Sequence, residues 1–434
     1  EAKNETEFLI RLASLHNNLA YLYNKQRFYE DARKHFDTSK NLWERVNYRR
    51  YLPTIYNNIG DLALRHGDTN TAFDYFKKAL TVGEKTEFTA GKSLAWVNFG
   101  EAYIKLGKFE QAEKSLLKAK ELIKKSEDKE FLPSVVNNLA LAKSKIRNFG
   151  VYYEFIEKYS PETLKKVDKI NPLTKTYLYY LVNIGQYDKV FRILNNNIAT
   201  IKNQQQEEFY YQMLGLIYLQ KRNYHAALEN IKTSLEFTKN LENVYAQTIN
   251  YIRLTECYLG LNQPEVALEN YKLGLRFAKK YNFSYWQLYL EILNIKIKLQ
   301  KKQLTFRKII RKLHEIIFSC KKAQLFLLEI TCYEILFQLY QVIKQNELSK
   351  EYFQKYKEKV VLAAEAIPEN DRETYFKKKM IFTDDFKNVK TITIKNRSRL
   401  TNKEWEDIYG LLRLKESSRI KFFIKDTFNK LFSP

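Results

Sequence analysis

The chain of 434 residues contains few of the residues that interrupt helices, with 12 glycines and 7 prolines. Both residue types destabilise helix interiors, so their scarcity favours long helices joined by short turns. The sequence also has no run of about 18 apolar residues, the length that a membrane-spanning helix requires. We therefore expect an all-α protein that is soluble and cytoplasmic and has no membrane partner.

Residues that carry chemistry are also sparse. The three cysteines, Cys257, Cys320 and Cys332, form no CxxC motif, and the five histidines show no spacing typical of metal ligands. The acidic residues are scattered over helix surfaces, and no pair of them is marked by a glycine-rich cleft. We expect buried, reduced thiols in an intracellular protein that is not an enzyme and needs no metal or cofactor.

The net charge of +24 is distributed unevenly. Residues 301–322 carry eight lysines and arginines against one acid, and residues 376–434 carry fifteen against seven acids. Such surfaces can bind nucleic acid, and the candidate residues are Lys301, Lys302, Arg307, Lys308, Arg311 and Lys312, together with the 376–434 surface. A composition rich in lysine throughout explains the same excess without a ligand, so nucleic-acid binding is an alternative hypothesis.

An internal repeat organises the first third of the chain. The segments 17–40, 57–80 and 97–120 align at an offset of 40 residues. The alignment places small residues at Ala20, Gly60 and Gly100, others at Ala32, Ala72 and Ala112, and large apolar residues at Phe36, Phe76 and Leu116. A repeat of this length is typical of one helical unit that is copied along a solenoid.

The third segment has the pattern W-x-x-F-G-x-x-Y-x-x-x-G-x-F-x-x-A-x-x-x-L-x-x-A, from Trp96 to Ala119, and closely resembles the tetratricopeptide repeat. The resemblance implies a right-handed α-solenoid superhelix of about nine helical hairpins, whose first helices line a concave groove. The repeat weakens along the chain. In the eighth repeat, at about 283–321, Arg307 stands where an alanine is expected, and the ninth covers about 322–367.

We divide the chain into repeats 1–4 (residues 1–160), repeats 5–9 (residues 161–367) and a linker with a helical tail (residues 368–434). In the tail, residues 389–394 (VKTITI) alternate like a short strand or an extended linker, and helices are expected after Thr401 and from Arg419. The tail loosely resembles the exit from tetratricopeptide arrays in large bacterial signalling proteins, where a GAF sensor follows. That resemblance implies a sensory or regulatory part of a signal-transduction or transcription-control protein, with other domains of a longer chain as partners.

A row of asparagines is the main candidate for a binding surface. Asn18, Asn58, Asn98 and Asn138 lie two residues before the small residue of each first helix, and Asn17, Asn57 and Asn137 flank them. An amide both donates and accepts hydrogen bonds, which suits it to the backbone of an extended peptide. In families that this stretch resembles, including kinesin light chains, asparagine at this position contacts bound peptide. The alternative is that the amides only join neighbouring helices. Met213 and Arg253 occupy the position in repeats six and seven, so we expect the row to end before them.

Overall fold

The computed structural model describes residues 2–26, 28–125, 131–146, 150–159, 161, 170–201, 203–301, 303, 305–365 and 367–379. The predicted strand at 389–394 and the predicted helices after Thr401 lie outside the described residues.

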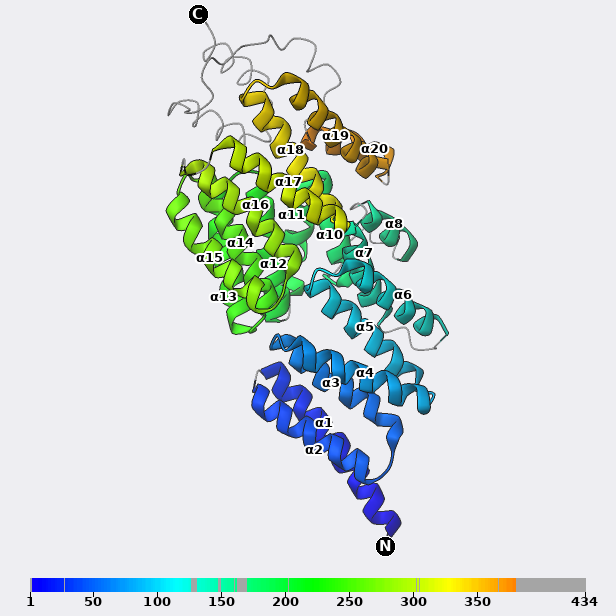
Figure 1. Cartoon of the computed structure of the whole chain (residues 1–434). Helices are drawn as coiled ribbons and strands as arrows, with labels where there is room; N and C mark the ends of the chain where they lie inside the picture. Colours follow the sequence, from blue (N-terminus) through cyan, green and yellow to red (C-terminus); the bar gives the residue numbers. More distant parts are fainter. Residues whose placement is uncertain are drawn as a thin grey trace, which may run out of the picture.

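Nineteen α-helices, arranged as nine consecutive hairpins and a final helix, form the described part of the chain, which contains no strand. The hairpins pair α1 (Ala2–Gln26) with α2 (Tyr29–Arg45), α3 (Leu52–Arg65) with α4 (Thr69–Lys85), α5 (Thr89–Lys105) with α6 (Phe109–Lys125), α7 (Leu132–Ile146) with α8 (Val151–Tyr159), α10 (Pro172–Ile184) with α11 (Tyr187–Asn196), α12 (Gln204–Gln220) with α13 (Tyr224–Asn240), α14 (Val244–Gly260) with α15 (Pro264–Lys280), α16 (Ser284–Gln300) with α17 (Phe306–Lys322), and α18 (Phe326–Val342) with α19 (Asn346–Glu365). Helix α20 (Glu369–Lys379) follows, and short 3₁₀ turns lie at Arg49–Tyr51 and Ile198–Thr200. The predicted α-solenoid is confirmed (Figure 1), and its right-handedness stays a prediction.

Small residues hold the regular hairpins together, as predicted. A Cβ atom on Gly60 would lie 2.4 Å from Cε1 of Phe76, and one on Gly100 would lie 2.4 Å from Cγ of Leu116. Ala112, on the facing helix α6, is fully buried. Two helices can approach this closely only where one of them carries little or no side chain.

Other hairpins depart from this pattern. Helices α8 and α11 have only 9 and 10 residues, and α16 and α17 approach each other closely at few points, in contrast to α5 and α6. The expectation that Arg307 occupies the alanine position was wrong. The connection before α17 is two residues longer than the one before α15, so the fully buried Ile309 takes the fourth position of its helix, as Ala112 does in α6, and Arg307 is exposed. The larger side chain of Ile309 holds α17 further from α16 than an alanine would.

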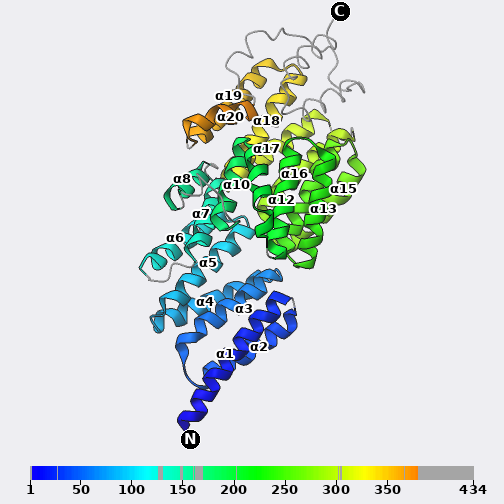
Figure 2. The ribbon, with the colours of Figure 1, turned by 180° about the vertical axis from the view of Figure 1, so that it is seen from behind.

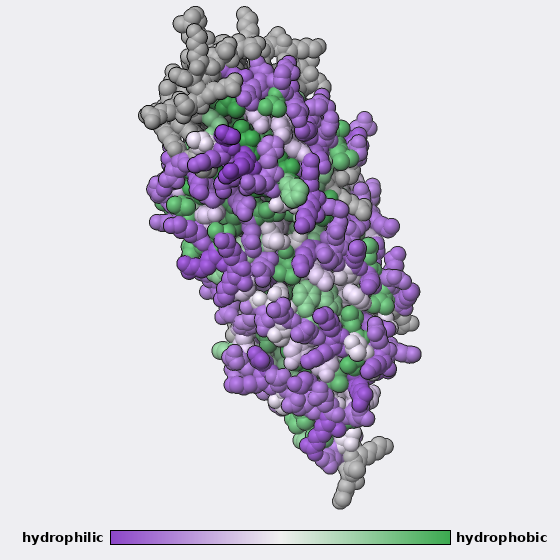
Figure 3. Space-filling model, viewed as in Figure 1, coloured by the Kyte–Doolittle hydropathy of each residue, from purple (hydrophilic) through white to green (hydrophobic). Residues whose placement is uncertain are grey.

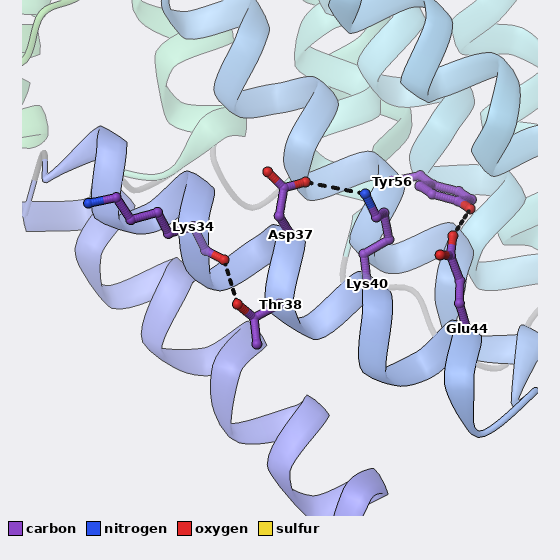
Figure 4. Close-up of polar contacts among 6 residues, drawn as sticks. All are labelled: Lys34, Asp37, Thr38, Lys40, Glu44 and Tyr56. Atoms are coloured by element: carbon purple, nitrogen blue, oxygen red, sulfur yellow. Dashed lines mark hydrogen bonds and ion pairs between the residues drawn. The ribbon is translucent and has the colours of Figure 1, made fainter.

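Consecutive hairpins are joined by side-chain hydrogen bonds as well as by packing. Figure 4 shows the boundary between the first two hairpins, where Tyr56 of α3 donates its hydroxyl to Glu44 of α2 at 3.1 Å. Burial, followed by the charge of Glu44, raises the pKa of Tyr56 to about 12. The other polar contacts in this view lie within α2, including the ion pair of Lys40 with Asp37.

The solenoid curls so that distant repeats meet. The hydroxyl of Ser284 donates to the carbonyl of Leu106 at 2.5 Å, and the rings of Phe109 and Tyr285 meet edge to face. At the other end, Asp371 of α20 accepts hydrogen bonds from Tyr180 and Gln186. The view from behind in Figure 2 shows α16 beside the middle of the array and α20 near α10.

The surface is mainly hydrophilic on the face that Figure 3 shows, with small apolar groups between the charged side chains. No described helix has both the length and the apolar character needed to cross a membrane. Cys257, Cys320 and Cys332 are buried and unbridged, as predicted.

Candidate functional site

The predicted asparagines lie on the surface formed by the first helices of the nine hairpins, which we call the first-helix wall. Asn58 on α3 donates its Nδ2 to Oδ1 of Asn17 on α1 at 2.9 Å. In the same way, Asn98 on α5 donates to Oδ1 of Asn57 on α3 at 3.4 Å. The structure therefore brings the predicted residues together in pairs that join consecutive repeats.

The pattern changes at the third repeat, because Val97 stands at the position that Asn17 and Asn57 occupy in the first two repeats and has no amide. Asn138 on α7 donates instead to Oε1 of Glu101 at 3.1 Å. Its neighbour Asn137 accepts a hydrogen bond at 2.8 Å from the hydroxyl of Thr176 on α10. Both residues thus keep a contact with a neighbouring first helix, through different partners.

The asparagines differ in their exposure. Asn57 and Asn98 are buried, and Asn57 donates to the carbonyl of Gly91 at 3.0 Å, whereas Asn58 is half-buried and Asn18 is exposed. An amide offers two N–H groups and two lone pairs, so a single bond leaves Asn58 able to contact a ligand as well. The helix-joining role is visible in the structure, and the peptide-binding role of the row stays a prediction.

A row of charged residues follows the asparagines along the same wall. The Nε of Arg65 lies 2.8 Å from Oδ2 of Asp61. One repeat later, Glu101 and Lys105 occupy the same two positions. Loss of hydration lowers the pKa of Lys105, and the charges of Glu101 and Asp61 oppose that effect. In these two repeats each cation is therefore matched by an acid one helical turn before it.

The fourth repeat lacks this pairing of an acid with a cation, because Leu141 stands at the position of the acid, one helical turn before Lys145. The Nζ of Lys145 lies 3.4 Å from the hydroxyl of Tyr285, which comes from the distant helix α16, and 4.6 Å from the centre of its ring. Loss of hydration, followed by the charge of Arg253, lowers the pKa of Lys145 to about 8. No ion pair joins Lys145 to an acid of the described residues.

The same wall contains a cavity of about 350 Å³ in the second half of the chain, which we call the chamber. Helices α10, α12, α14, α16, α18 and α20 all contribute to it. Leu219, Leu259 and Leu293 provide part of an apolar lining, and the charged lining residues are Arg222, Glu256, Lys296, Lys378 and Lys379. The size and the mixed lining are typical of a ligand pocket.

The chamber also contains tyrosines. The hydroxyl of Tyr289 donates to Oε1 of Glu256 at 2.5 Å. Burial, with the charge of Glu256 adding to it, raises the pKa of Tyr289 well above its usual value, and burial also raises the pKa of Tyr285. Both phenols are therefore neutral near pH 7 and add no negative charge to the lining.

Sequence reasoning missed the chamber, although a signal was present. Glu256 and Lys296 directly follow the position of the small residue in their repeats, as Asp61 and Glu101 do in theirs. The 40-residue offset therefore places them on the same wall. The chamber is closed by α20 and by the curvature of the solenoid. Both depend on contacts between residues that are far apart in the sequence, and the repeat pattern does not contain such contacts.

The residues of the predicted basic patch differ in their exposure and in their ion pairs. Lys301 forms an ion pair with Glu265 at 2.7 Å and is mostly covered. Arg307 and Lys308 are exposed on α17. On the same helix, Nε of Arg311 lies 3.7 Å from Oε1 of Glu315. Lys312 is half-buried on the same helix, and Lys302 lies outside the described residues. Nucleic-acid binding by these residues stays a prediction.

Met213 and Arg253, at the asparagine position of repeats six and seven, are both buried. Met213 belongs to the apolar core. The Nη1 of Arg253 donates to the carbonyl of Gln212 at 3.3 Å. Neither residue has a side-chain amide, so the asparagine row does not continue through these two positions.

The fold and the repeated small-residue contacts define a helical-repeat scaffold. Residues 11–85, 94–126 and 210–240 match family models described as tetratricopeptide repeat. The matched residues thus carry tetratricopeptide repeats, and such repeats generally build scaffolds for protein interaction. No curated protein sequence matches the chain.

Solved structures resemble the chain at low sequence identity. A Rap protein, complexed with competence and sporulation factor, is 13% identical with a TM-score of 0.57, over 82% of this chain and 99% of that one. A signal transduction ATPase with numerous domains and a tetratricopeptide repeat sensor, from Pyrococcus horikoshii, is 16% identical with a TM-score of 0.31, over 84% of this chain and 50% of that one. Yeast Tom70 is 15% identical with a TM-score of 0.30, over 86% and 97%. The likeness to the Rap protein is one of fold.

Proposed function

We propose that the chain is a non-enzymatic scaffold that binds a peptide or protein partner along the first-helix wall, acting as a concave groove. The asparagine amides would hold the backbone of an extended peptide, and neighbouring side chains would select its sequence. The observation that carries the proposal is the row of asparagines whose side chains join consecutive first helices. Asn58 donates to Asn17 and Asn138 donates to Glu101, while Asn58 and Asn138 both stay half-buried.

The row supports binding because of where it lies. Half-buried polar groups cost free energy unless they are hydrogen-bonded. The amides and charges of repeats two and three reduce that cost by pairing with one another, and the half-buried amide of Asn58 keeps further bonding capacity. A preformed polar wall of this kind can bind an extended segment with little rearrangement of the scaffold.

The first test is a selection of peptides from a displayed random library against the whole chain. The affinity of a selected peptide is then measured for the double variant Asn58→Ala, Asn98→Ala. We expect the far-UV circular dichroism of the variant to be unchanged and the binding to weaken by about tenfold or more, since each lost backbone contact contributes about 1 kcal/mol. A selection that returns no specific peptide would contradict the proposal.

A matched control comes from the second helices. Asn230 and Asn270 each donate Nδ2 to a carbonyl of their own helix, four residues earlier. The variant Asn230→Ala, Asn270→Ala makes the same chemical change away from the first-helix wall, and its affinity should match that of the unaltered chain. Equal weakening in both double variants would assign the asparagines a structural role alone.

We further propose that the scaffold is the sensory or regulatory part of a bacterial signal-transduction or transcription-control protein. This role is supported by the resemblance of residues 368–434 to the exit from repeat arrays of such proteins. Sequencing of the complete reading frame tests it. An adjoining GAF sensor or output domain is the expected finding, and a frame that contains only repeats would contradict the role.

A further inference from the structure

Helix α1 has an apolar stripe on the side that faces away from the rest of the array. We call this stripe the seam, and its residues, at alternate spacings of four and three, are Phe8, Leu12, Leu15, Leu19 and Leu22. Phe8, Leu15 and Leu22 are exposed, and Leu12 and Leu19 are half-buried. Single exposed apolar residues are common on protein surfaces, but a contiguous patch of them marks an interaction surface.

The equivalent positions are covered in the next repeat. The 40-residue offset relates the last four residues of the seam to four buried residues of α3, namely Leu52, Ile55, Ile59 and Leu62. These residues share one core cluster with Phe36 and Trp43 of the first hairpin. In α3 this side is therefore covered by the preceding hairpin. Helix α1 opens the described chain, so no described hairpin covers its seam.

The same side of α1 also carries an amide. Asn58, Asn98 and Asn138 each donate a side-chain hydrogen bond to the preceding first helix. Asn18 holds this position in α1, three residues after Leu15, and it is exposed. Both the apolar and the polar groups of a repeat-to-repeat interface are thus present on α1, without a described hairpin opposite them.

We propose that the seam is covered by α1 of a second copy of the chain, in an antiparallel pair with two-fold symmetry. Alternate spacings of four and three residues are those of a coiled-coil seam, where the side chains of two helices interlock. The alternation is the same in both directions along the helix, so the seam can pair with itself when one helix is reversed. A two-fold dimer requires such a self-complementary surface.

Charge and accessibility favour a second copy at this end of the molecule. The net charge of +24 makes two chains repel each other. Residues 1–46, however, carry eight lysines and arginines against seven acids, so the first hairpins can approach with little repulsion. Helix α1 has 25 residues, and its N-terminal end projects from the array (Figure 1). A second α1 can therefore lie along the seam.

The distribution of acids along α1 selects the antiparallel arrangement. Glu5 and Glu7 lie near its N-terminal end, and no acid occurs from Phe8 to Gln26. A parallel pair would bring the four carboxylates of two copies together, whereas an antiparallel pair keeps them at opposite ends. Their ion pairs with Arg45 and Arg11 are exposed and compensate them only weakly.

The antiparallel pair would also join the first-helix walls of the two copies. Its two-fold axis is perpendicular to α1 and runs in the direction that the wall faces, so both walls face the same side. The asparagine rows then meet at Asn17 and Asn18 of each copy, and the wall becomes continuous over two chains. A parallel pair would turn the walls to opposite sides.

Sedimentation equilibrium of the whole chain, from about 1 to 100 µM, tests the pairing. We expect a monomer–dimer equilibrium. The double variant Leu15→Gln, Leu22→Gln should raise the dissociation constant at least about 100-fold, since each dimer loses four apolar side chains from the seam. The matched control is Leu117→Gln, Leu362→Gln, which changes two exposed leucines of α6 and α19 and should alter the constant less than about twofold.

Folding of the variants is checked by circular dichroism. If the double variant is misfolded, Phe8→Gln takes its place, because Phe8 is the most exposed residue of the seam, at 62%. A chain that stays monomeric at about 100 µM overturns the proposal. A dimer that the seam variant leaves intact, or that the control weakens equally, places the contact elsewhere and also overturns it.

The orientation is measured with a nitroxide label on the variant Asn4→Cys, because the three native cysteines are buried. In the antiparallel pair the two labels should lie about 30 Å apart, since about 20 residues of helix separate them along the axis. Labels closer than about 20 Å would show a parallel pair and overturn the arrangement.

The complete reading frame supplies the remaining comparison. If the product of the complete frame is monomeric where this chain forms a dimer, a segment that precedes α1 covers the seam and the second copy is excluded. Peptide binding is measured separately by the library selection. The dimer and the proposed function can therefore fail independently.

Discussion

Helices α5 and α6 keep the repeat pattern, whereas α16 and α17 depart from it, and the two hairpins differ accordingly. Gly100 and Ala112 allow α5 and α6 to pack closely against each other. In the later hairpin Ile309 replaces the alanine, and the helices meet closely at few points. Small residues at the repeat position thus coincide with close helix packing, and their loss coincides with looser packing.

The same contrast holds for charge. In the third repeat Glu101 precedes Lys105 by one helical turn, and the two charges compensate each other. In the fourth repeat Leu141 removes that compensation, and Lys145 contacts Tyr285 instead. A scaffold that matches all of its polar groups internally has little left with which to recognise a partner. The departures from the repeat are therefore the better candidates for specificity.

The largest expected effect comes from placing a charge at the buried small-residue position of α6, with an exposed arginine of α17 as the comparison. Ala112→Arg places a charge at a fully buried position without a partner. It should lower the free energy of unfolding by about 3–5 kcal/mol. Arg307→Ala, at an exposed position of α17, should change it by less than about 0.5 kcal/mol. Urea denaturation followed by circular dichroism measures both.

If Arg307→Ala were as destabilising as Ala112→Arg, the assignment of Arg307 to the exposed face of α17 would be wrong. Arg307 would then be holding the hairpin together. A charge-neutral partner variant, Arg307→Gln, separates the two cases, because it keeps most of the side-chain length and removes the charge.

A second prediction compares the first hairpin with its successor at one repeat position. Ile55 is 2% exposed and packs between the first two hairpins, whereas Leu15, forty residues earlier, is 53% exposed. Ile55→Ala should cost about 2–5 kcal/mol of the free energy of unfolding. In the monomer, Leu15→Ala should cost less than about 1 kcal/mol, because its side chain is already largely hydrated.

Thermal melting at two protein concentrations checks this prediction and its control. Equal losses for the two variants, together with a melting temperature that rises with concentration, would show that a second copy of the chain covers Leu15 in solution. Equal losses without such a dependence would contradict the assigned packing of the first hairpin.

The sequence predicted the elements that local pattern controls. The 40-residue offset located the close contacts of Gly60 and Gly100, the number of hairpins and the alignment of the asparagines. It did not predict that Ser284 meets Leu106, or that Asp371 holds α20 on α10. Such contacts depend on small rotations that accumulate from repeat to repeat, and no single repeat encodes their sum. The chamber was missed for that reason.

The smallest predicted effect concerns pH and the first hairpin. The Nδ1 atoms of His16 on α1 and His35 on α2 lie 2.7 Å apart, so one ring must donate and the other accept. Burial, followed by the charge of His35, lowers the pKa of His16 below its usual value of 6.5. The unfolded chain therefore takes up a proton more readily than the folded hairpin as the pH falls.

It follows that this contribution to stability is complete above pH 6.5, the usual pKa of His16, and is lost as the pH falls through the lower pKa of the folded state. The loss should be below about 1 kcal/mol, because the pair is partly exposed. Hydrogen-exchange protection factors of α1 and α2, compared with those of α5 and α6, should fall between about pH 7 and pH 5.5. His35→Phe keeps the ring that stacks on Tyr23 and removes the second titrating group. It should remove only the smaller part of this pH dependence, which comes from the charge of His35, and leave the larger part, which comes from the burial of His16. His16→Phe should abolish most of the dependence, and a drop that persists in that variant would assign the effect to other groups of the hairpin.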